Sequence, residues 1–249
     1  IVVGPTAAEV EAKRRYVEAS KILKKDNITI DQAKKAIADG ADVNCGSGLP
    51  LYNACKTGNK ELVAYYLEVG AQPNLGPDEQ RLPINDAKDL EIIKMLVKNG
   101  ANFTPKAFKN FVDSKLGVFN KDAVEYFLQN GMNINFEGGY ALRNATRSGK
   151  IELIDYLVKN GSDPNLRKGM AFTWACEYGK PEAVDYLLKT GKIRSDVQEG
   201  GLVRGFQLAH ARNKKDDTGT FKKICDLIYT YAKEKNIPEL GKIEEIKKS

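Results

Sequence analysis

A short glycine phrase returns every 30 residues along this chain, and it constrains the fold more than any other feature of the sequence. The phrase reads Gly-Ala-Asp-Val-Asn at residues 40–44 and returns later in altered wording. Its glycines are Gly40, Gly70, Gly100, Gly131, Gly161 and Gly191, so the spacing is 30 residues with a single step of 31. Self-similarity at a period of roughly 20–50 residues is typical of stacked units that cannot bury their apolar faces alone. The sequence therefore predicts a stack of units in place of one globular core.

Each phrase follows a segment with the apolar spacing of a helix. Between Leu62 and Leu67, apolar residues stand at the i, i+1, i+4 and i+5 positions, and the same spacing recurs before Gly161. This spacing places the apolar side chains on one face of a helix. A glycine just past the last turn can adopt the left-handed backbone conformation that strains other residues. We therefore expect a helix to end at each of these glycines.

A shorter apolar segment precedes each of these helices. In three units it ends on a pair of small residues: Ala54 and Cys55, Ala145 and Thr146, Ala175 and Cys176. Small side chains at one position predict that neighbouring helices approach closely there. Gly58, Gly149 and Gly179 follow, and we expect them to turn the chain into the longer helix.

Residues 49–59 resemble a known repeat family. They read Leu-Pro-Leu-Tyr-Asn-Ala-Cys-Lys-Thr-Gly-Asn, which is similar to the ankyrin-repeat pattern T-P-L-H-x-A-A-x-x-G-H. The resemblance is strong over 41–74 and 131–191 and degenerate over 75–130. It implies an all-α fold, namely an ankyrin-repeat solenoid of helix-turn-helix units with helical caps. The degenerate stretch has two interpretations, either drift or reshaping around a partner.

The units differ from ordinary ankyrin repeats in length. An ankyrin unit has about 33 residues, whereas these have 30, and the loss falls between the glycine phrase and the first helix. The resemblance therefore implies shortened β-turn fingers. Units of this length and wording look like those of giant DNA viruses and some phages, which implies a viral or phage protein that acts on its host.

We expect three parts in the chain. Residues 1–39 are predicted to form N-terminal capping helices, 40–205 the ankyrin repeats, and 206–249 a last repeat, a C-terminal capping helix and a basic tail. The net charge is +6, and residues 204–249 hold 11 basic and 7 acidic side chains. This surplus is either an ordinary solvated face or a contact surface for nucleic acid or an acidic partner.

The N-terminal cap shows two helix starts. Thr6 with Glu9, and Thr29 with Gln32, have the spacing of capping boxes. We expect the first of these helices to cover the first repeat with its apolar residues, which are Val10, Val17, Ile22 and Leu23.

The chain lacks the residue patterns of catalysis. His210 is the only histidine, which removes most catalytic triads and metal sites. No phosphate-binding glycine loop is present, and carboxylates such as Asp155 recur once per unit, as solvent-facing residues do. The four cysteines lack metal-ligand spacing and fit a reducing compartment. We therefore expect no enzyme activity, no catalytic residues, no cofactor and no metal, in a cytoplasmic protein (the host cytoplasm if it is viral).

The resemblance places the binding surface on the turns and on the exposed side of each first helix, the concave face of ankyrin proteins. By position this marks Tyr52, Lys56, Thr57, Arg143, Arg147, Thr173, Trp174, Glu177 and Tyr178 as partner-binding residues. We hypothesise that Arg143, Arg147, Trp174 and Tyr178 form one patch across two adjacent units. Trp174 has two interpretations, as a core residue at the position of a leucine or as a half-exposed aromatic anchor.

The tyrosines of the longer helices share one position. They are Tyr65, Tyr126, Tyr156 and Tyr186. They are interpreted either as a ladder of contacts between units with each hydroxyl reaching water, or as a docking strip.

The predicted function is that of a non-catalytic protein–protein interaction module. It would bind a folded partner through the concave face, such as a host defence or regulatory protein. The alternative is association with nucleic acid or nucleoprotein through 204–249. No segment reaches the roughly 18 apolar residues that a membrane span needs, so we expect no membrane partner and a monomer when no partner is bound.

Overall fold

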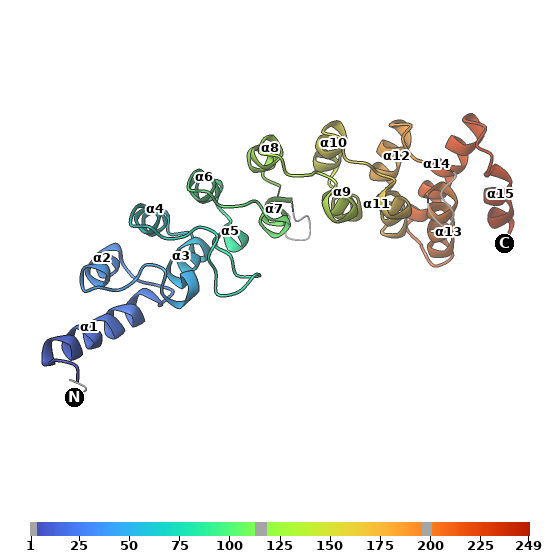
Figure 1. The fold of residues 1–249 in the computed structure, drawn as a ribbon. Coiled ribbons are helices and arrows are strands. Elements are labelled where there is room, and N and C mark those ends of the chain that lie inside the picture. The colour runs from blue at the N-terminus through green and yellow to red at the C-terminus, as the bar shows by residue number, and fades with distance from the viewer. Residues whose placement is uncertain (1–3, 113–118, 196–200) are drawn as a thin grey trace. The chain divides into compact units, whose positions relative to one another are not determined.

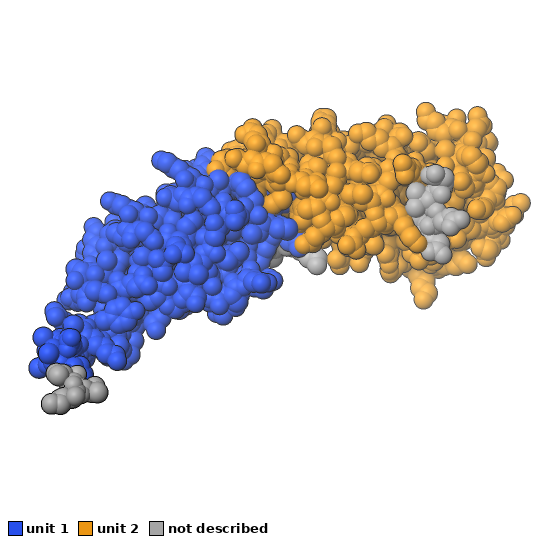
Figure 2. Space-filling model, in the orientation of Figure 1, with its two compact units in different colours: residues 1–111 blue, residues 112–249 orange. Residues whose placement is uncertain are grey.

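The computed structural model describes residues 4–112, 119–195 and 201–249, and every regular element in these ranges is an α-helix (Figure 1). The all-α class predicted from the sequence is thereby confirmed. None of the helices in these ranges is both long and apolar enough to cross a membrane. The chain divides into two compact units, residues 1–111 and 112–249 (Figure 2).

Unit 1 is built from helices that pack mainly on their sequence neighbours. They are α1 (Ala7–Leu23), α2 (Ile30–Ala38), α3 (Cys45–Thr57), α4 (Lys60–Glu68), α5 (Pro83–Asp86), α6 (Leu90–Lys98) and α7 (Pro105–Val112), whose last residue opens unit 2. α3 packs on α4 and α5, and α4 packs on α6. The core between them combines aliphatic residues such as Leu51, Val63 and Ile93 with the aromatic residues Tyr66 and Phe108, all of them buried.

In unit 2, two rows of helices alternate along the chain. Its helices are α8 (Lys121–Gln129), α9 (Phe136–Ser148), α10 (Ile151–Lys159), α11 (Leu166–Glu177), α12 (Pro181–Lys189), α13 (Gly201–Asn213), α14 (Thr220–Glu234) and α15 (Leu240–Lys248). α11 packs between α9 and α13, and these three are called the inner helices. α12 packs on α10 and α14, and these three are called the outer helices. A Cβ atom on Gly205 would lie 2.6 Å from Phe172 and 2.9 Å from Cys176. The close approach predicted at the Ala175–Cys176 pair is therefore present where α13 meets α11.

The helix ends follow the local signals in the sequence. The six phrase glycines all have positive φ: Gly40 97°, Gly70 96°, Gly100 92°, Gly131 88°, Gly161 93° and Gly191 66°. This confirms their role as left-handed helix ends. Both capping boxes are also formed. The hydroxyls of Thr6 and Thr29 accept from the main-chain N–H of Glu9 and Gln32, and the main-chain N–H of each threonine donates to the Glu9 or Gln32 side chain.

The prediction that α1 covers the first repeat with Val10, Val17, Ile22 and Leu23 is met in part, because only the C-terminal end of the helix makes the contact. Its buried residues, Ala19, Ser20 and Leu23, all lie at its C-terminal end. Val10 and Val17 are 55% and 41% exposed. The neighbours of α1 are α2 and α3, and its N-terminal half extends past them at the end of unit 1 (Figure 1).

An asparagine ladder joins successive glycine phrases within each unit. The Nδ2 of Asn44 donates to the carbonyl of Gly70 (3.1 Å), and its Oδ1 accepts from the N–H of Gln72 (2.8 Å). Three more asparagines make the same pair of bonds: Asn74 to Gly100 and Asn102, Asn135 to Gly161 and Asp163, Asn165 to Lys192 and Arg194. Every partner in the next phrase is a main-chain group, so the ladder fixes one phrase to the next whatever side chains the second one carries.

The third phrase carries Thr104 at the ladder position. Its hydroxyl donates to Oδ1 of Asn85 and accepts from the N–H of Ala107 at 3.1 Å. Thr104 therefore uses its polar group inside unit 1, where it caps α7.

Removing a rung of the ladder is expected to destabilise unit 2. Asn135→Ala takes away two hydrogen bonds to main-chain groups, and we expect a loss of about 1–2 kcal/mol in the free energy of unfolding. Trp174 is the only tryptophan in the chain and lies in unit 2, so urea unfolding followed by its fluorescence reports on this unit. Asn160→Ala is the control, because Asn160 donates only to Tyr156 of its own helix. Equal losses for the two variants would contradict a special role for the ladder.

Candidate protein-binding surface

Three repeats contain a tight left-handed turn at the start of α3, α9 and α11, within the bounds of each helix and before its regular part begins. Three consecutive residues have positive φ at 46–48, 137–139 and 167–169, with values from 47° to 79°. Each turn is closed by a main-chain bond from its last glycine to the ladder asparagine four residues earlier, at 3.0 Å. Four of these residues are not glycine: Ser47, Glu137, Arg167 and Lys168. Left-handed conformations cost such residues roughly 1–2 kcal/mol each, so the turns are a demanding local geometry.

The turn at 137–139 anchors Arg143 of α9. Nε of Arg143 donates to the carbonyl of Gly138 (3.1 Å), and Nη2 donates to the carbonyl of Glu137 (2.9 Å). Its Nη1 lies 3.3 Å from Sδ of Met170. Burial, and then the neighbouring charge of Arg167, lower the pKa of Arg143. The guanidinium is thus held in place before any partner arrives.

Arg143, Arg147, Trp174 and Tyr178 stack into one group, here called the arginine–aromatic cluster. The guanidinium carbon of Arg143 lies 5.4 Å from the Trp174 ring centroid. That of Arg147 lies 5.6 Å from the Trp174 ring and 4.5 Å from the Tyr178 ring. The two rings meet edge to face at 6.4 Å and 75°. The structure therefore brings together all four residues of the predicted patch.

The cluster follows from helix spacing. Arg143 and Arg147 are four residues apart on α9, and Trp174 and Tyr178 are four apart at the end of α11, so each pair occupies one helix face. α9 and α11 pack against each other, which brings the two faces together. Tyr178 is 42% exposed, and the other three side chains are half-buried.

The interpretation of Trp174 as a core residue is wrong. Phe172, two residues earlier, fills the core position and is fully buried. Trp174 instead occupies the position that Asn53 and Asn144 hold in other units, and its ring lies between α11 and the arginines of α9. It is therefore a half-exposed aromatic residue of the surface.

Two of the predicted partner-binding side chains are not accessible. Tyr52 is 7% exposed and Thr173 is 8% exposed. The Tyr52 hydroxyl donates to the carboxylate of Asp86 (2.9 Å), and Thr173 Oγ1 donates to the carbonyl of Met170 (3.3 Å). Both side chains point into contacts with neighbouring residues, so neither can serve as a partner contact in this structure.

The remaining predicted residues are Lys56, Thr57 and Glu177. Lys56 and Thr57 are exposed and belong to unit 1. Glu177 lies next to Tyr178 in sequence and pairs with Arg212 of α13 at 3.4 Å. Glu177 thus borders the cluster, with its charge already engaged.

Three of the tyrosines that share one position contact the preceding 30-residue repeat. The Tyr186 hydroxyl of α12 donates to Asp155 of α10 at 2.9 Å. The Nζ atoms of Lys34 and Lys121 lie 5.8 Å from the ring centroids of Tyr65 and Tyr156 respectively. These three tyrosines make contacts between successive repeats, as the first interpretation predicted. The Tyr186 hydroxyl differs from that interpretation, because it reaches a carboxylate and not water.

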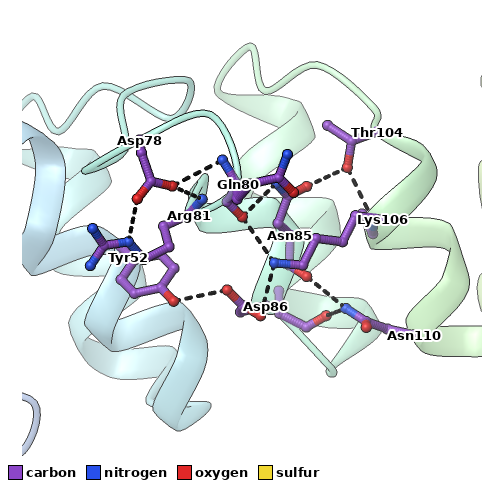
Figure 3. Close-up of polar contacts among 11 residues, drawn as sticks. Tyr52, Asp78, Gln80, Arg81, Asn85, Asp86, Thr104, Lys106 and Asn110 are labelled. Atoms are coloured by element: carbon purple, nitrogen blue, oxygen red, sulfur yellow. Dashed lines mark hydrogen bonds and ion pairs between the residues drawn. The ribbon is translucent and has the colours of Figure 1, made fainter.

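The degenerate stretch contains a polar network in unit 1 that the sequence did not reveal (Figure 3). Asn85 of α5 is 3% exposed, and its Nδ2 donates to the carbonyl of Gln80 (3.0 Å). The same carbonyl accepts from Nζ of Lys106 (2.9 Å), which also lies 3.6 Å from Asp86. Asn110 of α7 donates to the carbonyl of Asn85 at 3.0 Å. Loss of the repeat pattern here accompanies a specific set of contacts.

A folded-back loop supplies the carbonyl of Gln80 to this network. The loop runs from Gly76 to Leu82, and a Cβ atom on Gly76 would lie 2.2 Å from the carbonyl oxygen of Arg81. Asp78 closes the turn by accepting from the main-chain N–H of Arg81 (2.9 Å) and from its Nε (2.7 Å). The signal that could have indicated this loop is the polar run Asp-Glu-Gln-Arg at 78–81, but its partners are distant in sequence.

Ionisation of the Tyr52 hydroxyl is expected to lower the free energy of unfolding at alkaline pH. Burial, and then its bond to Asp86, raise the pKa of Tyr52 to about 12 from 10.0. The unfolded chain releases this proton near pH 10 while the folded chain keeps it, so the stabilisation is complete below pH 10 and is lost as the pH approaches 12. We expect the free energy of unfolding to fall by about 2–3 kcal/mol over this range. Denaturation followed by circular dichroism should show a shallower fall in Tyr52→Phe, and identical slopes would contradict the assignment.

Comparison with known proteins gives no family for this chain. No protein-family model matches the sequence, and no curated protein matches it. The functional argument therefore depends on the surface itself.

Proposed function

We propose that this chain is a non-catalytic protein-binding module, which binds a folded partner through the arginine–aromatic cluster. The observation that carries the proposal is the stack of two guanidiniums and two aromatic rings on adjacent inner helices. Arginine and aromatic side chains are enriched in the cores of protein interfaces and dominate their binding energy. Because the four side chains are already stacked, little conformational entropy is lost on binding.

We assign the scaffold to the ankyrin-repeat solenoids, with 30-residue units and shortened fingers. Support comes from the resemblance of residues 49–59 to the ankyrin pattern, from the helix ends at phrase glycines, and from the asparagine ladder. The likeness of the 30-residue units to those of giant DNA viruses and phages supports a host defence or regulatory protein as the partner. In that case the chain acts in the host cytoplasm.

Association with nucleic acid through 204–249 has less support. Arg212, Lys222 and Lys223 each pair with a carboxylate, namely Glu177, Asp226 and Glu182. Cations that are matched in this way supply less of the unbalanced positive field that phosphate backbones require.

The test is capture of the partner and measurement of its affinity with purified proteins. We expect Arg147→Glu combined with Tyr178→Ala to weaken binding at least tenfold, since hot-spot truncations commonly exceed this. Lys233→Glu is the control, because it makes the same charge change on an exposed residue of α14 in the same unit. Partner affinity within twofold of the unchanged protein in the double variant would exclude the cluster. Nuclease-sensitive capture with a steep salt dependence would move the function to 204–249.

A further inference from the structure

The surroundings of the arginine–aromatic cluster carry an excess of positive charge. Besides its own two arginines, Arg167 lies close enough to Arg143 to lower the pKa of that guanidinium after the effect of burial. Arg167 also covers the turn at 137–139, because a Cβ atom on Gly138 would lie 2.5 Å from its Nε. Arg212 is the fourth cation. Two carboxylates offset part of this charge, namely Glu177, which pairs with Arg212, and Glu137, which acts on Arg143 in the opposite sense to Arg167. The partner surface that complements this region is therefore acidic.

Arg147 has hydrogen-bond donors that are available to a partner. Its guanidinium carbon lies 4.5 Å from the ring centroid of Tyr178 and 5.6 Å from that of Trp174, so the group is held against two aromatic rings. Its N–H groups make no hydrogen bond or ion pair with any residue that the structure describes. Arg143, by contrast, donates two of its N–H groups to main-chain carbonyls. A guanidinium that is held against aromatic rings while its N–H groups have no partner among the described residues presents a planar fork, which matches one carboxylate in a bidentate pair.

We propose that the arginine–aromatic cluster receives an acidic segment of the partner protein. One Asp or Glu carboxylate of that segment binds the N–H groups of Arg147, beside the rings of Trp174 and Tyr178. This inference rests on the proposed function and names the chemistry of the partner. A nucleic-acid backbone fits less well, because its affinity comes from many phosphates contacted along a track of cations. At the cluster, in contrast, the unengaged donors of Arg147 lie beside the rings of Trp174 and Tyr178, and no track of cations runs through them.

Trp174 makes the proposal directly measurable. As the only tryptophan, it reports any ligand of the cluster through its fluorescence. The probe is a short peptide of alternating glutamate and aspartate with both ends blocked, and the control is the matching peptide of glutamine and asparagine. We expect a saturable change in Trp174 emission with the acidic peptide alone. No saturable change up to millimolar acidic peptide, or an equal change with the neutral one, overturns the proposal.

Substitutions at Arg147 identify the contact. Arg147→Gln is expected to weaken binding of the acidic peptide at least tenfold. Arg147→Lys should weaken it as well, since lysine keeps the charge but lacks the planar fork. Lys233→Gln, on α14, should leave it unchanged. Circular dichroism establishes that each variant is folded. Unchanged binding by Arg147→Gln, or tighter binding of a single-stranded thymidine oligonucleotide than of the peptide at the same salt concentration, overturns the carboxylate assignment.

Competition separates this inference from the proposed function. If the acidic peptide displaces the captured partner, both stand. If the partner depends on the cluster but the peptide neither binds nor competes, the module function stands and the acidic segment is wrong. If no partner depends on the cluster, the proposed function fails, whatever the peptide does.

Discussion

Replacing Gly48 with alanine is expected to lower the free energy of unfolding of unit 1 by about 3–4 kcal/mol. Gly48 is the last residue of the left-handed turn at 46–48, with φ of 79°. Alanine would incur the left-handed penalty, and its Cβ would lie 2.5 Å from the carbonyl oxygen of Leu75. That neighbour is main chain, so it cannot move aside as a flexible side chain would. The glycine phrase that follows α4 would have to shift away from the turn.

Gly58→Ala is the matched control for this prediction. Gly58 has φ of 75°, and a Cβ atom there would meet nothing within 4 Å. It should therefore show the backbone penalty alone, about 1–2 kcal/mol. Amide hydrogen exchange in α3 and α4 measures the stability of unit 1 separately from unit 2. If both variants lose the same amount, the close approach to Leu75 contributes nothing and the argument for the turn fails.

Asn85→Ala is expected to destabilise unit 1 by about 2–3 kcal/mol. The carboxamide of Asn85 is buried, donates to the carbonyl of Gln80 and accepts from the hydroxyl of Thr104. Its removal leaves that hydroxyl without its acceptor and opens a small cavity beside α7. The carbonyl of Gln80 keeps its bond from Lys106, which limits the loss.

Gln80→Ala is the control for Asn85→Ala. Gln80 takes part in the network only through main-chain groups, since its carbonyl accepts from Asn85 and Lys106 and its N–H donates to Asp78, and its side chain is exposed. We therefore expect a change within about 0.5 kcal/mol. Hydrogen exchange in α5 and α7 measures both variants. A loss for Gln80→Ala as large as that for Asn85→Ala would contradict the importance of the buried carboxamide.

Local signals explain what could be predicted from the sequence. Helix starts at Thr6 and Thr29 and helix ends at the phrase glycines depend on contacts within a few residues, so spacing alone identifies them. The arginine–aromatic cluster was predictable for a related reason. Its members are four residues apart on two helices that occupy equivalent places in neighbouring units, and the repeat places those helices side by side.

The features that were missed depend on partners distant in the sequence. Tyr52 occupies a surface position in the pattern, yet Asp86 of a shortened helix draws its hydroxyl inward. The exposure of the N-terminal half of α1 depends on where α2 and α3 end. The network around Asn85 depends on Lys106 and Asn110. None of these relationships shows in the spacing of apolar residues.

The asparagine ladder has a consequence for how such a chain can change its length. Each rung reaches 26 and 28 residues ahead, or 27 and 29 at Asn165, and binds a carbonyl and an N–H that any residue supplies. The four N–H donors come from different residue types, namely Gln72, Asn102, Asp163 and Arg194. A tandem duplication or deletion of 30 residues would therefore keep every rung in register without any compensating substitution. Growth by copying thus requires only that the join preserve the period, while the exposed helix faces remain free to acquire new partners.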